Sequence, residues 1–123
     1  MKAKKVLVLL TLSIVPWFAV SQETYYWTYT YGNASIYGDL VEFSYFTEVN
    51  TLECEATKEE IKTKLDTYMS PLIKNWDNHY SQVRFFNSYS DAEDDRNYLM
   101  NRDRQKGIGV RPKYARFKYN CNY

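Results

Sequence analysis

The sequence predicts a single small α+β domain, in which a four-stranded sheet carries two helices packed on one face in the order ββαβαβ. Three observations predict this fold. Segments rich in threonine and aromatic residues alternate with a period of two, which is typical of strands. Two Ser/Thr-x-x-Glu capping boxes mark the starts of two helices. Cysteine occurs only at positions 54 and 121, which favours one disulfide in a domain of this size.

The first 21 residues predict a secretory signal peptide that is cleaved after Ser21. Residues 1–5 carry three lysines and no acid, residues 6–20 are almost entirely apolar, and Ala19 and Ser21 are the small residues of a cleavage site. The apolar run is shorter than the roughly 20 residues that span a bilayer, so we expect no stable membrane insertion after cleavage. The short lysine-rich start is bacterial in type. We therefore expect an exported protein, periplasmic or extracellular, whose mature domain is residues 22–123.

The first two strands are predicted as a hairpin. Residues 24–31 alternate threonine with aromatic side chains, and Gly32-Asn33 matches a two-residue turn. Residues 35–49 form the second strand, in which Gly38-Asp39 marks either a bulge or a shift of the turn. One side of the first strand carries an aromatic row that consists of Tyr25, Trp27, Tyr29 and Tyr31.

The first helix is predicted to begin at the capping box Thr57-Lys58-Glu59-Glu60. Pro71 interrupts the helical pattern, so either the helix kinks there or Ser70 caps a short second helix with Pro71 at its first position. The apolar stripe of this stretch consists of Ile61, Leu65, Tyr68, Leu72 and Trp76.

The rest of the chain predicts a strand, a helix and a final strand. Residues 80–89 alternate as a strand, and the second capping box, residues 90–93, opens a helix that ends at Gly107. Acids in the first turns of this helix and bases in its last turn complement the helix dipole. Residues 112–121 form the final strand. Its predicted inward side chains are Ala115, Phe117, Tyr119 and Cys121.

The two cysteines are expected to pair, because an exported domain folds in an oxidising compartment. A Cys54–Cys121 bridge closes a loop of 67 residues, which contributes on the order of 4 kcal/mol in the chain-entropy description. A metal site formed by these cysteines and His79 is not favoured, because C-x-x-C spacing is absent. We predict no metal and no cofactor.

Charge is distributed unevenly along the mature chain. Residues 22–95 contain fourteen acids and five bases, whereas residues 96–123 contain eight bases and one acid. Either the basic final strand lies beside acidic elements of the same domain, or it forms a basic face for an anionic partner. Nucleic acid is not an expected partner, because the protein is exported and the mature chain is slightly acidic. The bases of the final strand are Arg111, Lys113, Arg116 and Lys118.

The aromatic row also has two interpretations. If it faces solvent, it is a stacking platform for a glycan, a peptide or another protein. If it faces a helix, it is the core side of the first strand. About a hundred residues cannot easily bury all the aromatic rings of this sequence, which favours some exposed aromatic contact surface.

The function that we expect is a small exported binding or structural module. It would dock on a cell-envelope protein or glycan through the aromatic row, the basic final strand or both, and self-association through an open strand edge is a further option. The alternative is a small secreted hydrolase in which His79 acts as a base with Asp77 as its carboxylate partner. No nucleophile with a known signature accompanies these two residues, so an enzyme is the less favoured class.

Overall fold

The structure is a computed structural model that describes residues 23–106 and 110–121. The predicted signal peptide and Gly107 lie outside the described residues. The predicted α+β class and the ββαβαβ order are confirmed, with one short additional strand after the second. The elements are β1 (Thr24–Ile36), β2 (Asp39–Phe46), β3 (Asn50–Leu52), α2 (Lys58–Met69), β4 (Asn78–Phe86), α3 (Tyr89–Gln105) and β5 (Val110–Tyr114).

The sheet is built around β1. Strand β4 pairs with β1 in antiparallel fashion over residues 25–33, which occupies one side of β1. Strands β2 and β3 also pair with β1, so they follow one another along its other side. The backbone N–H of Thr47, which lies between them, donates to the carbonyl of Thr28 at 3.1 Å. Strand β5 lies parallel to β2, so β4 forms one edge of the sheet, and β5 and the short β3 form the other.

The turn between β1 and β2 lies at Tyr37-Gly38, where φ is 51° and 85°. The turn predicted at Gly32-Asn33 is therefore wrong, and the shift that Gly38-Asp39 suggested is correct. Two consecutive positive φ angles are what a two-residue hairpin of type I′ requires. Gly32 has a packing role instead, because a Cβ at this position would collide with the indole of Trp76.

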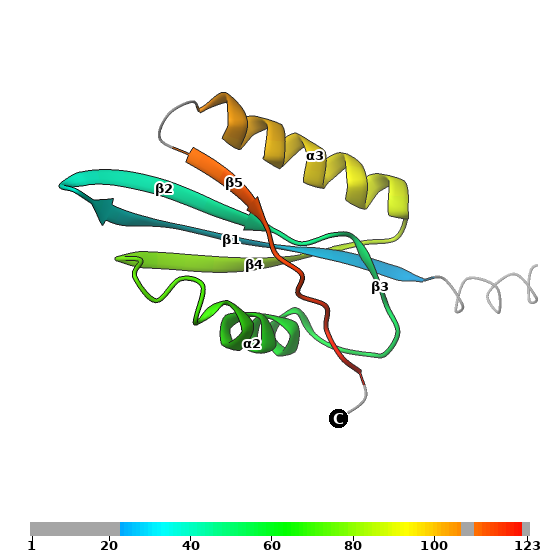
Figure 1. Cartoon of the computed structure of the whole chain (residues 1–123). Helices are drawn as coiled ribbons and strands as arrows, with labels where there is room; N and C mark the ends of the chain where they lie inside the picture. The colour runs from blue at the N-terminus through cyan, green and yellow to red at the C-terminus, as the bar shows by residue number, and fades with distance from the viewer. Residues whose placement is uncertain (1–22, 107–109, 122–123) are drawn as a thin grey trace, which may run out of the picture.

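The two helices pack on opposite faces of the sheet, as Figure 1 shows, and the prediction that they share one face is wrong. Strands β2, β4 and β5 are mutually parallel, so the connections through α2 and α3 are both crossovers. The first crossover runs from β2 across β1 to β4, and the second runs back from β4 to β5. Both connections are expected to have the same, right-handed sense. Two connections of the same handedness that cross the sheet in opposite directions place their helices on opposite faces of the sheet.

Each face has its own buried cluster, which we name after its helix. On the α3 face, alternate residues of β1 meet Phe46, Val49 and the helix. On the α2 face, the opposite side chains of β1 and β4 meet the helix and residues 115–121, which we call the C-terminal segment. The α3 cluster contains Trp27, Tyr29, Phe46, Val49, Ala92, Leu99 and Met100, and the α2 cluster contains Tyr26, Ile61, Leu65, Met69, Ile73, Val83, Ala115, Phe117 and Tyr119.

The capping box of α2 is confirmed, because the Thr57 hydroxyl accepts from the Glu60 N–H at 3.1 Å and the Glu60 carboxylate accepts from the Thr57 N–H at 3.4 Å. Neither alternative at Pro71 is correct: α2 ends at Met69 and the chain continues as turns. The second helix begins at Tyr89 with Ser88 as its N-cap, rather than at the predicted capping box of residues 90–93.

The final strand is shorter than predicted, because its ladder ends at Tyr114. The C-terminal segment nevertheless keeps the predicted alternation, with Ala115, Phe117 and Tyr119 buried. The Tyr119 N–H donates to the Tyr26 hydroxyl at 2.8 Å. The predicted disulfide is confirmed, with a distance of 5.9 Å between the Cα atoms of Cys54 and Cys121. It fastens the end of this segment to the connection between β3 and α2.

Candidate functional site

The aromatic row lies on the α3 face. Trp27 and Tyr29 are 0% and 2% exposed, because α3 covers them. Tyr25 and Tyr31, at the two ends of the row, are half-buried. The hypothesis of an exposed stacking platform is therefore wrong for the two central rings, and the alternative interpretation of the row as the core side of the strand is correct for them.

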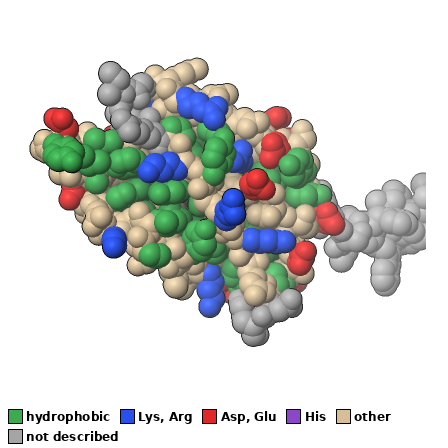
Figure 2. Space-filling model, viewed as in Figure 1, with side chains coloured by type: hydrophobic (Ala, Val, Ile, Leu, Met, Phe, Trp, Pro, Cys, Tyr) green, Lys and Arg blue, Asp and Glu red, His purple; other side chains and the backbone are tan. Residues whose placement is uncertain are grey.

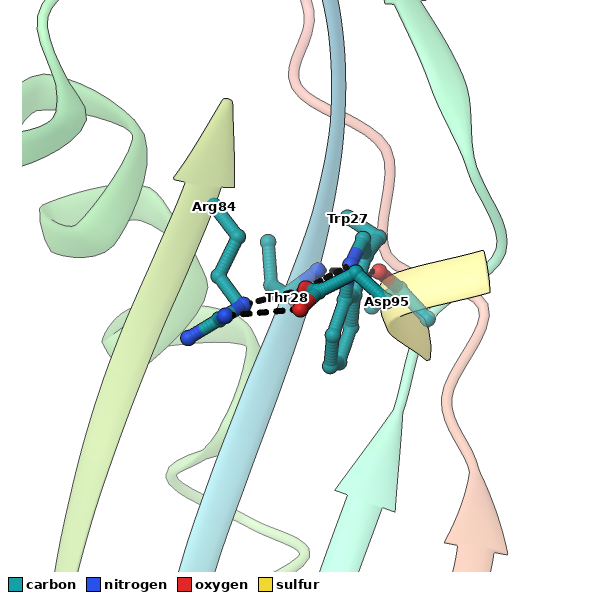
Figure 3. A network of polar contacts seen from close by, with 5 residues as sticks. Trp27, Thr28, Arg84 and Asp95 are labelled. Carbon is teal, nitrogen blue, oxygen red and sulfur yellow. Dashed lines mark hydrogen bonds and ion pairs between the residues drawn. The ribbon is translucent and has the colours of Figure 1, made fainter. Parts of the chain in front are cut away.

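Polar atoms of the row are bound by α3, as Figure 3 shows for one network. The indole N–H of Trp27 donates to Asp95 Oδ2 at 3.1 Å. Arg84 of β4 reaches the same carboxylate, with 2.8 Å between its Nη2 and Asp95 Oδ1, and its guanidinium lies over the Trp27 ring. Asp95 therefore joins α3 to two strands at once.

A second network of polar contacts connects β1 to the C-terminal part of α3. The Tyr29 hydroxyl donates to Asp103 Oδ2 at 2.9 Å, and Arg102 pairs with Asp103 Oδ1 at 3.1 Å. Asp103 is fully buried, so its charge depends on these two partners. Burial and then the bond to Asp103 raise the pKa of Tyr29 above its ordinary value, which keeps the hydroxyl protonated as a donor.

The predicted catalytic pair is not assembled. His79 is exposed near the start of β4, beside a shallow hollow of about 200 Å³ lined by Asn33 and Asn78 among others. The Asp77 carboxylate accepts from the Ser35 hydroxyl at 3.1 Å, and no bond joins it to His79 among the described residues. Both cysteines lie in the disulfide, so neither thiol is a nucleophile. The geometry adds no support for the hydrolase.

The bases of the final strand divide into three situations. The side chain of Arg111 lies outside the described part of the structure. Lys113 lies over the ring of Phe43, 5.1 Å from its centroid, on a stack in which Trp76 covers Phe43 and Tyr45. Arg116 and Lys118 point outward from the C-terminal segment and are exposed.

Arg116 and Lys118 line a groove between the C-terminal segment and α2. Its volume is about 500 Å³, and we call it the basic groove. In Figure 2, Lys and Arg side chains run through the middle of this face among hydrophobic ones, while most acids lie toward its sides. The residues that line the basic groove are Lys64, Thr67, Tyr68, Arg116, Phe117, Lys118 and Asn120.

The charged side chains that line the basic groove all have the same sign. Its three charged lining residues are all cations, and no carboxylate is among them. Within the described ranges, neither Arg116 nor Lys118 forms a hydrogen bond or ion pair with another residue. Two aromatic rings lie beside the cations, those of Tyr68 and Phe117, with their centroids 5.6 Å apart. Tyr68 is 39% exposed, so its ring is accessible from the groove.

Two neighbouring grooves differ from it in charge. Arg116 and Lys118 also line a groove of about 480 Å³ on the other side of the C-terminal segment, but there Glu48 is part of the wall. A third groove, of about 450 Å³ near the disulfide, contains Glu55 and Glu60 and no base. The basic groove is therefore the one among these three that suits an anion without a competing carboxylate.

Sequence reasoning missed the contribution of α2. It assigned Tyr68 to the apolar stripe and gave no role to Lys64 or Thr67. The relevant signal is the pair Lys64 and Tyr68, which lie four residues apart and so share one side of a helix. Combined with the predicted disulfide, which holds the basic final strand near the first helix, this pair could have indicated the groove.

No protein-family model, curated protein sequence or solved structure matches this chain. Among the described residues, no group of three or more His, Cys, Asp or Glu side chains is positioned to hold a metal ion. The helices of the described ranges are all too short or too polar to cross a membrane.

Proposed function

We propose that this protein is an exported binding module that captures an anionic glycan of the cell envelope in the basic groove. The single observation that carries the proposal is the lining of that groove, in which three cations and two aromatic rings meet without a carboxylate. Export is supported by the disulfide, which is typical of oxidising compartments, and by the predicted signal peptide.

The charge of the basic groove supports the binding of an anion. Arg116 and Lys118, which have no ion-pair partner in the described structure, lose little when they bind an anion, because no internal bond of theirs has to break. The guanidinium of Arg116 can bind a carboxylate or phosphate with two parallel hydrogen bonds. Lys118 adds a second positive charge two residues away on the same side of the segment.

The aromatic rings of the basic groove support the binding of a sugar. A sugar ring has an apolar side, which packs on an exposed tyrosine at little cost in conformational entropy. Tyr68 is accessible, and Phe117 is buried beneath the same groove, where it supports the Tyr68 ring. Asn120 also lines the groove, and the Thr67 hydroxyl, which donates to the Thr63 carbonyl at 3.2 Å, keeps a lone pair that can accept from a sugar hydroxyl. A charged sugar therefore fits the lining better than a simple inorganic anion.

The test compares polymers that differ in charge. Binding of polygalacturonate, which is carboxylated, and of poly(ribitol phosphate), which is phosphorylated, would be measured by isothermal titration calorimetry, with neutral dextran as the third ligand. We expect at least one anionic polymer to bind and dextran not to bind. Affinity should fall as salt is raised, because exposed charges are screened.

Charge-reversal variants locate the site. Arg116→Glu with Lys118→Glu should weaken binding at least about tenfold, because two attractive charges become repulsive. Lys74→Glu changes an exposed lysine that lines none of the three grooves, and it should bind as the unmodified protein does. Equal binding by the double variant, equal binding of dextran, or binding of neither anionic polymer would overturn the proposal. In the last case, docking on an envelope protein becomes the function to test.

A further inference from the structure

Strand β4 presents a long edge that no other strand covers in the described structure. It extends over nine residues, pairs with β1 on one side, and has α2 and α3 on its two faces. The opposite edge of the sheet consists of β3, which has three residues, and β5, which has five residues and contains Pro112 between two basic positions. Proline and charge at an edge oppose further pairing, and β4 contains no proline. The β4 edge is therefore the one that is suited to accept another strand.

The pairing pattern shows which backbone groups of β4 point outward. The Asp77 N–H donates to the carbonyl of Asn33, whereas Thr28 accepts from Thr47 on the other side of β1. Odd-numbered residues of β1 therefore bond toward β4, and even-numbered residues bond toward β2 and β3. Tyr29 is odd and lies opposite Gln82, so Gln82 bonds inward to β1. Backbone groups alternate along a strand, so the outward set is His79, Ser81, Val83 and Phe85.

An antiparallel second copy fits this outward set in one best register. When Gln82 lies opposite Gln82 of the second copy, Ser81 faces Val83 and His79 faces Phe85. Every outward residue then has an outward partner, and each such pair exchanges two N–H···O bonds. A register shifted by two residues leaves outward backbone N–H and C=O groups without partners at both ends of the pair. A register shifted by one residue places the outward residues of one strand opposite inward residues of the other.

Side chains on the α3 face agree with this register. Gln82 is exposed and lies on the two-fold axis. On either side of it, Tyr80 of one copy faces Arg84 of the other in a close, non-hydrogen-bonded pair. Tyr80 is 53% exposed, and the guanidinium of Arg84 is held in place by Asp95. A tyrosine ring beside a fixed guanidinium is a favourable contact, so no like charges meet across the edge.

We propose that this protein forms a two-fold symmetric dimer, in which β4 pairs with β4 of a second copy about Gln82. The symmetry axis is perpendicular to the sheet, so both α2 faces lie on one side of the joined sheet. The two basic grooves would then face the same way and could bind one polymer together, which raises the effective affinity. The dimer itself does not depend on the proposed ligand.

The experiment is sedimentation velocity on the disulfide-bonded protein over a series of concentrations, without any glycan. We expect a reversible monomer–dimer equilibrium. Gln82→Glu places like charges opposite one another and should raise the dimer dissociation constant at least about fivefold. Gln82→Lys should do the same, and an equimolar mixture of the two variants should recover association, because opposite charges then meet.

The control is Asn97→Glu, which adds the same charge at an exposed position on α3 away from the β4 edge. It should dimerise as the unmodified protein does. A monomer at every concentration would overturn the proposal, as would a dimer that Gln82→Glu and Asn97→Glu affect equally, or a mixture that shows no recovery. None of these outcomes concerns the basic groove, so the two proposals fail independently.

Discussion

The two faces of the sheet are held by different kinds of interaction. On the α3 face, large rings from β1 bind buried or half-buried carboxylates of the helix, at Asp95 and Asp103. On the α2 face, apolar side chains pack under a segment that a disulfide fastens at its end. The aromatic row of the α3 face suggested a recognition surface in the sequence, yet the two central rings of the row are buried. An aromatic row is available for recognition only where no helix packs over it, and the number of rings alone does not reveal this.

The largest expected effect is on the α2 face. Replacing both Cys54 and Cys121 by serine should lower the free energy of unfolding by about 4 kcal/mol, because the open loop gains entropy in the unfolded chain. Urea denaturation followed by circular dichroism would measure the change. Reducing agent should destabilise the unmodified protein and leave the double variant unchanged. Equal urea midpoints for the oxidised and reduced protein would show that the α2 face does not depend on its covalent bond.

The next effect tests the α3 face. Asp103→Ala should lower the free energy of unfolding by about 3 kcal/mol, because it leaves the buried Tyr29 hydroxyl and Arg102 without their carboxylate. Asp94→Ala, at an exposed position on the same helix, should change it by less than about 0.5 kcal/mol. Similar losses in the two variants would mean that the polar network is not what holds this face.

Alkaline pH should weaken both faces through one tyrosine on each. Burial raises the pKa of Tyr26 to about 12, and the pKa of Tyr29 is raised for the same reason and by its bond to Asp103. A raised pKa in the folded state means that the unfolded chain loses its proton first as pH increases. The contribution of each tyrosine to the free energy of unfolding is therefore fully present below about pH 10. It falls between pH 10 and 12 by about 1.4 kcal/mol per pH unit for each tyrosine.

Phenylalanine variants separate the two contributions to this pH dependence. Tyr26→Phe and Tyr29→Phe should each make the fall in urea midpoint above pH 10 less steep. Each variant also loses a hydrogen bond, so the slopes with pH are compared rather than the absolute stabilities. Between pH 7 and 9, the difference from the unmodified protein should not change. Slopes that remain identical in both variants would contradict the assignment.

The smallest effect concerns two buried serines, one on each face. Within the described residues, the Ser44 hydroxyl on the α3 face has no hydrogen-bond partner, whereas Ser81 bonds to Thr30 on the α2 face at 2.9 Å. Ser44→Ala should therefore be neutral or stabilise by about 0.5 kcal/mol, because it removes an unsatisfied buried group. Ser81→Ala should cost about 1 kcal/mol. Thermal denaturation would rank the two, and the reverse order would contradict this prediction.

Local patterns in the sequence were sufficient for much of the fold. The alternation in β1, the capping box at Thr57 and Glu60, and the disulfide all depend on short spacings or on a single cysteine pair. The hairpin turn was not predictable in the same way. Tyr37 has a positive φ, which tyrosine rarely adopts, while Gly32-Asn33 has the composition of a turn and forms none. Gly32 is explained by the Trp76 indole that lies against it, which only the folded chain reveals.

The placement of the helices and the basic groove required the order of the strands. A crossover rule gives the hand of each connection, but the direction of each one across the sheet depends on long-range pairing. The same limit applies to the groove, since Lys64 and Arg116 meet only because the C-terminal segment leaves the sheet after Tyr114 and crosses toward α2. Arg116 and Lys118 were predicted as binding residues, and their role remains a proposal.

The two faces also differ in their optical properties. Trp27 lies on the α3 face without exposure to solvent, and Trp76 lies half-buried on the α2 face against Gly32. Indole emission shifts to longer wavelength when the ring becomes wet, so each face contains its own natural fluorophore. A protein that retains one of these two indoles at a time would show by emission colour whether both sides of the sheet open together or in succession.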